Sequence, residues 1–313
     1  MTSQAAVDAL VPDRLPKSSQ QKLSVVTVTY NSARVLGRLL DSVEVGLDGV
    51  IDFEVVVVDN ASDDDTVAVA RAHPLELRII ESRRNGGYAA GINAAADTIA
   101  ADRTILVLNP DIRLMQGSAA SLVARLSDDS RVGIAVPVMA EENGALSYSL
   151  RREPSLATAW TEALLGGSLA TRLGISEVIG PSPLYQVGGC VEWATGAALA
   201  IAPKARAAVG DWDESFFLYS EEVDYMRRVR AAGLRVECVP AARVVHVGGE
   251  REENPRLFSL MAANRIRDYG RRHSLISTTL FRAAVICGEA LRSPRGRGHR
   301  AALRAALLAR SAD

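Results

Sequence analysis

The feature that most constrains the fold is a repeated unit in which a short apolar run ends at a polar turn and a helical pattern follows. Four such runs occupy residues 23–29, 53–58, 77–80 and 104–108. They show little alternation of polar and apolar side chains, which indicates strands that are buried on both faces. The sequence therefore predicts an α/β fold with a mostly parallel central sheet flanked by helices.

Polar side chains gather where these strands end. Thr29-Tyr30-Asn31 closes the first strand, Asp59 the second, Arg84-Asn85-Gly86-Gly87 the third, and Asp111 follows the fourth. Ligands of such sheets bind in the crevice beyond the carboxyl ends of the strands. We therefore expect the functional site at this edge of the sheet.

Composition excludes several classes of protein. The 313 residues are 48% hydrophobic and 23% charged, which is typical of a globular protein and argues against a disordered or fibrous chain. Three widely spaced cysteines, Cys190, Cys238 and Cys287, argue against a disulfide framework or a thiolate zinc site and fit a reducing compartment. Residues 1–22 are polar, without the apolar core of a signal peptide, and no run approaches the length of a membrane span. We expect a flexible segment at 1–22 and a cytoplasmic protein.

Charge is distributed unevenly along the chain. From Asn264 onward there are eleven arginines against three acidic residues, a net charge of +8, whereas the rest has 25 basic and 34 acidic residues, or −9. We expect the basic end to be helical and to meet an anionic membrane surface. The alternative is a helical pair that packs on the body or on a second copy in a homodimer. Nucleic acid is not expected, because the basic stretch lacks interleaved aromatic residues.

Two motifs on the first three strands are individually weak. Asp59 stands at a strand edge, where its carboxylate could accept the N3–H of a uracil or thymine ring, whereas Asp63 and Asp64 are expected only to complement the next helix. Asn85-Gly86-Gly87 opens a helix and could bring backbone N–H groups to a phosphate, although a simple tight turn explains the glycines equally well. The spacing is not G-x-G-x-x-G, so a dinucleotide fold is not supported.

Three further groups are candidates for chemistry. Asp111 is a single hard carboxylate suited to Mg²⁺ or Mn²⁺ carried by a substrate phosphate, or a turn residue. Glu221 and Glu222 begin a helix, where they either complement the helix dipole or supply a general base whose pKa is raised by crowding and burial. His246 is a lone histidine in an apolar strand, either a core residue or a metal ligand.

Seven motifs, in this order and at these spacings, together resemble the family 2 inverting glycosyltransferases of the GT-A fold, and among them the bacterial rhamnosyltransferase-type branch. The motifs lie at residues 28–31, 58–62, 85–91, 108–111, 193–197, 216–224 and 245–246. The resemblance covers residues 23 to 249.

The resemblance implies a role for each candidate residue. Glu222 would deprotonate the acceptor hydroxyl, and Asp111 and His246 would hold a divalent cation, for which a nitrogen ligand favours Mn²⁺ over Mg²⁺. Trp212 and Tyr219 would shape the acceptor side. The nucleotide and donor side would be formed by Thr29, Tyr30, Asn31, Asp59, Asn85, Gly86, Gly87, Asn109 and Trp193.

Two positions depart from the family pattern. The second acidic residue of the helix is Glu222 where the family usually has Asp, which leaves open whether Glu221 or Glu222 is the base. Many members have two carboxylates in the metal motif, whereas Asn109 here leaves Asp111 alone, as is common in the rhamnosyltransferase-like branch. We therefore expect weak metal affinity in the absence of nucleotide.

The expected function is transfer of a sugar, L-rhamnose from dTDP-L-rhamnose, to a polyprenyl-diphosphate-linked or polysaccharide acceptor in cell-envelope biosynthesis at the inner face of the plasma membrane. A UDP-hexose or galactofuranose transferase is the alternative within the family, and a degenerate sugar-nucleotide-binding module is the alternative outside enzymes. A pyrophosphorylase would need a Gly-rich basic loop after the first strand, which residues 29–32 do not provide. The expected domains are a catalytic GT-A domain at 23–255 and a basic helical extension at 256–313.

Overall fold

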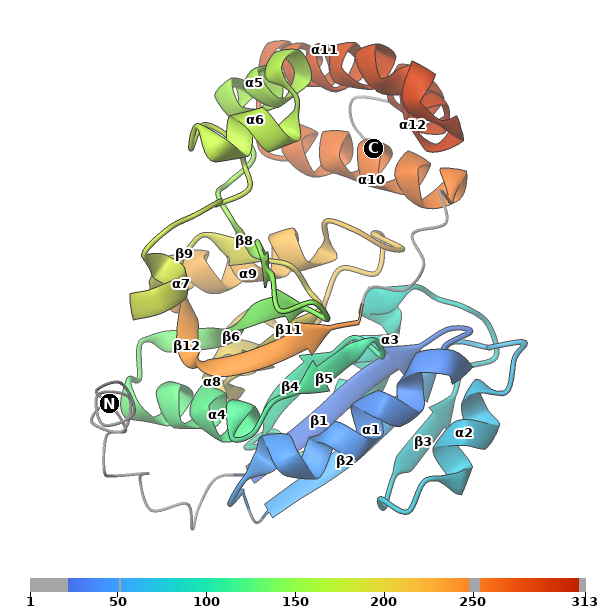
Figure 1. Cartoon of the computed structure of the whole chain (residues 1–313), viewed down its shortest axis with the longest axis vertical. Coiled ribbons are helices and arrows are strands. Elements are labelled where there is room, and N and C mark those ends of the chain that lie inside the picture. Colours follow the sequence, from blue (N-terminus) through green and yellow to red (C-terminus); the bar gives the residue numbers. More distant parts are fainter. Residues whose placement is uncertain (1–21, 51, 248–253, 310–313) are drawn as a thin grey trace, which may run out of the picture.

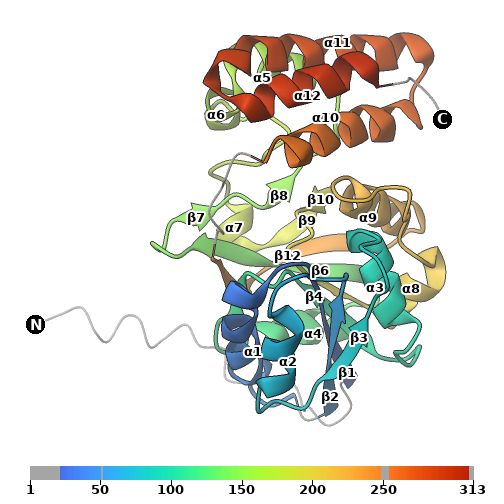
Figure 2. The same cartoon turned by 90° about the vertical axis from the view of Figure 1, so that its right-hand side faces the viewer.

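The computed structural model describes residues 22–50, 52–247 and 254–309, which form an α/β body with a layer of helices stacked on it (Figures 1 and 2). The strands are β1 (Lys22–Thr29), β2 (Asp52–Asp59), β3 (Arg78–Glu81), β4 (Thr104–Leu108), β5 (Ile112–Leu114), β6 (Val132–Glu141), β7 (Leu146–Ser147), β8 (Leu150–Arg151), β9 (Gly189–Val191), β10 (Trp193–Ala194), β11 (Ala198–Ile201) and β12 (Arg235–His246). Residues 1–21 of the segment that we expected to be flexible lie outside the described residues.

The central sheet has the order β3-β2-β1-β4-β11-β6-β12-β5, with β7 paired to β6 and β9 to β12. The first four strands are parallel to one another, and β12 is parallel to β6. Strand β11 is antiparallel to both of its neighbours, and β5 is antiparallel to β12. The predicted α/β fold with a mostly parallel sheet is confirmed.

Helices cover both faces of this sheet. One face is packed by α1 (Ala33–Leu47), α2 (Thr66–Ala72) and α4 (Ser118–Asp128), and the other by α3 (Tyr88–Ala96), α8 (Pro203–Val209) and α9 (Glu221–Ala231). In α1 the residues Leu36, Leu39, Leu40 and Val43 recur at helical spacing and are all buried, because that stripe faces the strands. A short helix, α7 (Leu184–Val187), precedes β9.

The helical layer has a hydrophobic core of its own. It consists of α5 (Leu156–Leu165), α6 (Gly167–Arg172), α10 (Pro255–Gly270), α11 (Leu275–Arg292) and α12 (Arg297–Leu308), with a 3-10 turn, η2 (Ser293–Arg295), before α12. Ile266, Tyr269 and Phe281 lie at its centre. The expected helices beyond residue 256 are present, and α5 joins them from the middle of the chain, packed along α11 (Figure 1). The domain boundary at residue 256 stays a prediction.

Strand register brings the motifs to one edge of the sheet. Thr29 is opposite Asp59, and Asp59 is opposite Glu81, so the first three strands end level with one another. At the far side of the sheet His246 is opposite Ile112, next to Asp111. The carboxyl edge of the sheet faces the helical layer (Figure 2). Within the described segments no helix has the length and apolar character needed to cross a bilayer.

Candidate active site

Asp59 is the centre of a hydrogen-bonded cluster at the ends of β1 and β2. The Thr29 hydroxyl donates to Asp59 Oδ1 at 3.0 Å, and the Ser62 hydroxyl donates to the same oxygen at 2.6 Å. The Ser62 backbone N–H donates to Asp59 Oδ2 at 2.9 Å. The carboxylate is buried and held in one orientation, and Tyr30 beside it is half exposed and open to a ligand. Lone pairs that these bonds leave unused can accept the imide N–H of a pyrimidine.

The turn after β1 is tied to the turn after β2. Asn31 has a left-handed φ of 52°, and its backbone N–H donates to Ser62 Oγ at 2.8 Å. The Asn31 side-chain oxygen accepts from the Asp63 backbone N–H at 2.9 Å. Asn31 therefore acts in this structure as a brace between the two loops that flank Asp59.

The glycine motif docks on the loop that precedes α9. Gly87 has a φ of +93°, and a Cβ there would lie 2.2 Å from the Phe217 carbonyl oxygen. That oxygen accepts from the Tyr88 backbone N–H at 2.9 Å, while Asn85 Oδ1 accepts from the Gly87 N–H at 3.0 Å. Glycine is required at 87 by both the conformation and the close approach. The motif thus joins the turn after β3 to the loop that leads into the acidic helix.

Asp111 and His246 meet at the far side of the edge. The distance from His246 Nε2 to Asp111 Oδ2 is 3.1 Å, and Asp111 Oδ1 is buried without a hydrogen-bond partner among the described residues. The Asp111 carbonyl accepts from the Val247 N–H at 2.8 Å, which locks the end of β12 to the strand-end motif. The Asn109 N–H donates to the Ala197 carbonyl at 2.8 Å, so Asn109 is held by the segment that leads into β11.

These two side chains fit a divalent cation that is shared with a substrate. An orphaned carboxylate oxygen and an imidazole nitrogen that converge are a ligand pair suited to Mn²⁺. In the described part of the chain, no three His, Cys, Asp or Glu side chains lie together as a complete metal site. A cation here would take its other ligands from water or from a bound phosphate.

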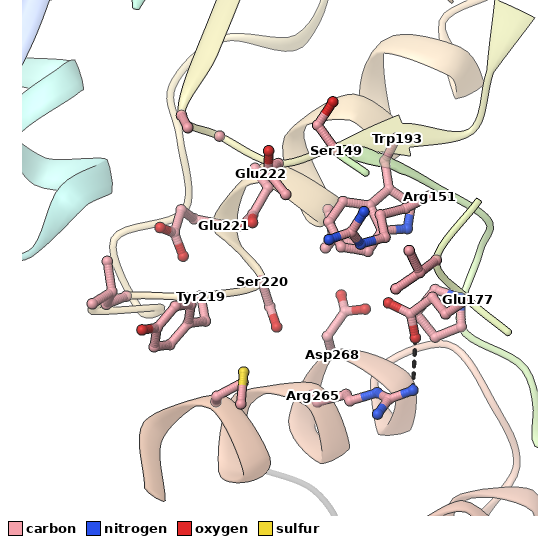
Figure 3. A pocket seen from close by; sticks show the side chains of 18 of the residues that line it. Ser149, Arg151, Glu177, Trp193, Tyr219, Ser220, Glu221, Glu222, Arg265 and Asp268 are labelled. Carbon is pink, nitrogen blue, oxygen red and sulfur yellow. Dashed lines mark hydrogen bonds and ion pairs between the residues drawn. The ribbon is translucent and has the colours of Figure 1, made fainter. Parts of the chain in front are cut away.

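The acidic helix α9 begins from a strained turn. Tyr219 and Ser220 have left-handed φ angles of 70° and 78°, which are uncommon for residues with a side chain. Asn264 in α10 supports the turn, because its side-chain amide donates to the carbonyls of Leu218 at 2.9 Å and Tyr219 at 3.2 Å. The turn directs the first residues of α9, Glu221 and Glu222, toward the space under the helical layer (Figure 3).

Glu221 and Glu222 are two adjacent carboxylates that lack full hydrogen-bond compensation. Glu221 is 3% exposed, and the Oε2 atom of each residue is buried with no hydrogen-bond partner in the described structure. Burial raises the pKa of Glu222 and raises that of Glu221 well above its ordinary value, where the charge of Glu222 adds to the effect. A pKa raised in this way makes a carboxylate a better proton acceptor, as a general base requires.

Tyr88 lies between the acidic helix and the Asp111 side. Its hydroxyl donates to the Gly196 carbonyl at 2.9 Å. Burial raises the pKa of the Tyr88 phenol well above its ordinary value, and the negative charges of Glu221, Glu222 and Asp111 raise it further. The partly buried Tyr88 thus lies within electrostatic range of all three carboxylates and links the acidic helix to the Asp111 side.

A cavity of about 550 Å³ lies between the carboxyl edge of the sheet and the helical layer. Figure 3 shows Glu221, Glu222, Ser149, Arg151 and Trp193 on its body side, with Arg265 and Asp268 across from them on α10. Of the predicted site residues, the cavity is lined by Asn109, Trp193, Tyr219, Glu221, Glu222 and His246. Thr29, Tyr30, Asn31, Asp59, Asn85, Gly86, Gly87 and Asp111 do not line it, although His246 connects Asp111 to it.

The two predicted acceptor-side aromatic residues have different positions. Tyr219 lines the cavity. Trp212 does not, because its buried ring stacks on Tyr225 with centroids 4.3 Å apart, and Asn93 accepts from its backbone N–H at 2.9 Å. The structure thus corrects the expectation for Trp212, whose apolar ring supports α9 from behind rather than facing an acceptor.

Ion pairs hold the helical layer over the cavity. Arg227 of α9 bridges Glu153 and the buried Asp268 of α10, with its shortest N–O distances to them 2.8 and 2.9 Å. Arg265 of α10 pairs with Glu162 at 2.9 Å and Glu177 at 2.7 Å. Buried charges persist only when they are paired in this way, so the layer is fixed by charge as well as by apolar packing.

Two residues of the site, Arg151 and Asn264, were not expected from the sequence. Arg151 lies opposite Trp193 in the β8–β10 pair and extends over its ring, with the guanidinium carbon 5.8 Å from the ring centroid. Its position within Ser149-Leu150-Arg151-Arg152-Glu153 carries no signal, because the partner strand is more than 40 residues away in the sequence. Asn264 is equally remote from the turn that it supports.

Comparison with known proteins identifies the family. The model of the family described as "Glycosyl transferase family 2" matches residues 24–183. The chain is 29% identical, over 72% of its length and 75% of the relative's, to an N-acetylglucosaminyl-diphospho-decaprenol L-rhamnosyltransferase of Mycobacterium tuberculosis. It is 25% identical to the rhamnosyltransferase WbbL of Escherichia coli, over 50% of this chain and 56% of that one.

A solved structure shares the fold. A mannosyltransferase from Pyrobaculum calidifontis, determined in complex with GDP-Man and Mn²⁺, superposes with a TM-score of 0.59 at 16% identity, over 95% of this chain and 89% of that one. The match covers the helical layer as well as the sheet, since it extends over nearly the whole chain. Because the family model spans half of the sequence and the predicted motifs lie on the expected strand ends, the chain belongs to glycosyl transferase family 2 and is a glycosyltransferase of the GT-A fold.

Proposed function

We propose that this chain transfers L-rhamnose from dTDP-L-rhamnose, with inversion, to the sugar of a polyprenyl-diphosphate-linked acceptor. The observation that carries the proposal is the cavity in which two under-compensated carboxylates, Glu221 and Glu222, face the space next to the Asp111–His246 pair. The names of the relatives at 29% and 25% identity support rhamnose as the sugar, and the first of them supports a lipid diphosphate as the carrier of the acceptor.

Glu222 is the proposed general base. Its carboxylate takes the proton of the acceptor hydroxyl while that oxygen forms a bond to the anomeric carbon. The bond from the anomeric carbon to the diphosphate oxygen breaks, and its electron pair leaves with dTDP. A pKa raised by burial brings the proton affinity of Glu222 nearer to neutral pH, which strengthens it as a base. Glu221 keeps the pair crowded and is the alternative base.

The donor is held at the other end of the edge. Asp59, fixed by Thr29 and Ser62, accepts from the pyrimidine, and the exposed Tyr30 ring lies against the nucleoside. Asp111 and His246 would hold Mn²⁺ or Mg²⁺ together with the donor diphosphate. A cation bound there supplies neutralisation of the charge that builds up on the departing diphosphate.

The helical layer is the proposed contact with an anionic membrane. Leu275, Ile276 and Leu308 are 66%, 75% and 80% exposed. Arg282 of α11 extends to the end of α12, where it donates to the Ala306 carbonyl. Apolar side chains beside arginine are typical of a surface that inserts shallowly into anionic lipid. Arg265 and Arg272 are instead paired with acidic residues, so only part of the basic charge in the sequence is available for lipid.

Calorimetric titration tests the donor assignment. Purified protein is titrated with dTDP-L-rhamnose, UDP-galactose, UDP-glucose and UDP-N-acetylglucosamine, each with and without Mn²⁺. We expect metal-dependent binding of dTDP-L-rhamnose, its loss in Asp111→Asn, and its retention in Asp102→Asn, which removes an exposed carboxylate at the opposite edge of the sheet. Preference for a UDP-hexose would contradict rhamnose as the sugar and favour the hexosyltransferase alternative. Donor binding to Asp111→Asn equal to that of the unmodified chain would contradict the metal role.

A further inference from the structure

Arg151 is a cation on the cavity wall that the proposed mechanism does not use. It lies in β8 directly opposite Trp193 of β10, and this cross-strand position places its guanidinium over the indole ring. Its Nη1 donates to the carbonyls of Tyr148 and Leu150, and these bonds fix one side of the guanidinium. The rest of the guanidinium is directed into the cavity beside Glu222 (Figure 3).

The charge of Arg151 is not matched in the way that its neighbours' charges are. Arg265 and Arg227, which approach the same region from α10 and α9, each bridge two carboxylates. Among the described residues Arg151 forms no ion pair; its polar partners are backbone carbonyls. Burial lowers the pKa of the guanidinium, and the nearby charges of Glu177 and Glu222 only partly offset this effect. A partly buried cation without an ion pair is costly unless an anion from outside binds it.

The remaining walls indicate which anion that is. On one side of Arg151 are Glu221 and Glu222, where the acceptor hydroxyl is deprotonated. On the far side the lining is apolar at Phe258, Ala262, Val285 and Ala302, and its charged residues are already paired: Glu162 and Glu177 with Arg265, Asp268 with Arg227, and Glu289 with Arg292. The parts of the lining without an ion pair are therefore the carboxylates Glu221 and Glu222, the cation Arg151, and the apolar residues of the helical layer. A sugar joined through a diphosphate to a prenyl chain has a matching hydroxyl, anion and hydrocarbon.

We propose that Arg151 binds the diphosphate of the lipid-linked acceptor, with the acceptor sugar at Glu222 and the first isoprene units against α10–α12. The planar guanidinium offers parallel N–H donors that suit phosphate oxygens, and the Trp193 ring keeps it in that orientation. The donor diphosphate would be held separately, by the cation that Asp111 and His246 would bind. This inference rests on the proposed acceptor class and adds the residue that recognises it.

The test compares two acceptors in Arg151→Gln and Arg151→Lys. One acceptor is N-acetylglucosaminyl diphosphate on a farnesyl chain, and the other is octyl N-acetylglucosaminide, which has no phosphate. Arg152→Gln is the matched control, since Arg152 donates to the Ser176 carbonyl and does not line the cavity. Thermal unfolding confirms that each variant is folded, and calorimetry gives its affinity for dTDP-L-rhamnose with Mn²⁺.

For Arg151→Gln we expect the KM for the diphosphate acceptor to rise about tenfold to a hundredfold, as for loss of a charge-assisted hydrogen bond. Arg151→Lys should recover part of the loss, because lysine keeps the positive charge but lacks the parallel N–H donors of the guanidinium. The KM for the octyl glycoside and the affinity for the donor should be unchanged, as should all values for Arg152→Gln.

Several results would overturn the inference. An equal loss with both acceptors means that Arg151 only supports the fold around Trp193. Weakened donor binding with an unchanged acceptor KM assigns the guanidinium to the donor diphosphate. If the unmodified chain transfers sugar to polysaccharide but not to the lipid diphosphate, the proposed acceptor class is wrong and the role of Arg151 falls with it. If the unmodified chain uses the lipid diphosphate and Arg151→Gln keeps its KM, the function stands and only the role of Arg151 is wrong.

Discussion

The contact between Gly87 and the Phe217 carbonyl allows a quantitative prediction about how the site is assembled. An alanine Cβ at 87 would lie 2.2 Å from that oxygen, about 1 Å inside a normal van der Waals contact, and the residue would keep a φ of +93°. With a ψ of 179° as well, the backbone lies in a region that is essentially confined to glycine, where a side chain costs about 1–3 kcal/mol. Displacing the carbonyl adds about 1–3 kcal/mol for overpacking and about 1 kcal/mol for the weakened Tyr88 N–H bond. We expect Gly87→Ala to lower the free energy of unfolding by about 3–7 kcal/mol.

Gly166→Ala separates the two contributions. Gly166 has a φ of 79° and a ψ of 149°, similar to the angles of Gly87, but a Cβ there would meet nothing within 4 Å. Its substitution should therefore cost only the conformational share, about 1–3 kcal/mol. Urea unfolding of the two variants, with equal m values, gives the difference, which we expect to be at least about 2 kcal/mol. Equal destabilisation of the two variants would refute the close approach of the glycine motif to the loop before α9.

Three further predictions concern the acidic helix. Glu222→Gln should lower kcat by about 10²–10⁴-fold with donor affinity unchanged, measured by steady-state kinetics and calorimetry; if only Glu221→Gln does so, the base is Glu221. The pKa of Glu221 is raised in the folded protein, so above pH 4.5 the residue ionises more readily in the unfolded chain than in the folded one. The free energy of unfolding of the unmodified chain therefore falls as pH rises above 4.5. The Glu221→Gln variant should thus gain stability relative to the unmodified chain as pH increases, measured by urea unfolding across the pH range, and a gain confined to low pH would contradict this sign. Asn264→Ala should lower kcat without weakening donor binding, because it removes the two hydrogen bonds that support the Tyr219–Ser220 turn. An unchanged kcat would show that the turn keeps its conformation without Asn264.

The parts of the fold that sequence patterns predicted are those fixed by local chemistry. Each apolar run from β1 to β4 is followed at once by its polar turn, so strand ends and their side chains could be assigned without knowing the partners. A parallel sheet then brings those ends to one edge, as Thr29 and Asp59 show. The pairing of Asp111 with His246 came from the family resemblance rather than from spacing, since it depends on the register of β12 with β5.

The rest depends on contacts between segments that are distant in the sequence. Trp212 stands in an aromatic segment near the acidic helix, but whether its ring faces the cavity or Tyr225 is decided by packing against α3 and α9. The position of Arg151 in the site depends on its pairing with Trp193 across the β8–β10 pair. The sequence of α5 does not indicate that this helix packs on α11. Residues of both helices line the helical side of the cavity.

The most direct test of the central claim is transfer of labelled sugar. The full chain is incubated with radiolabelled dTDP-L-rhamnose, Mn²⁺ and N-acetylglucosaminyl diphosphate on a prenyl chain, and radioactivity is counted in the lipid extract. We expect label in the lipid for the unmodified chain and a loss of about a hundredfold or more for Glu222→Gln, although both bind the donor. Metal-dependent donor binding without transfer of label would contradict the proposed function, as would equal transfer by Glu222→Gln, Glu221→Gln and the unmodified chain.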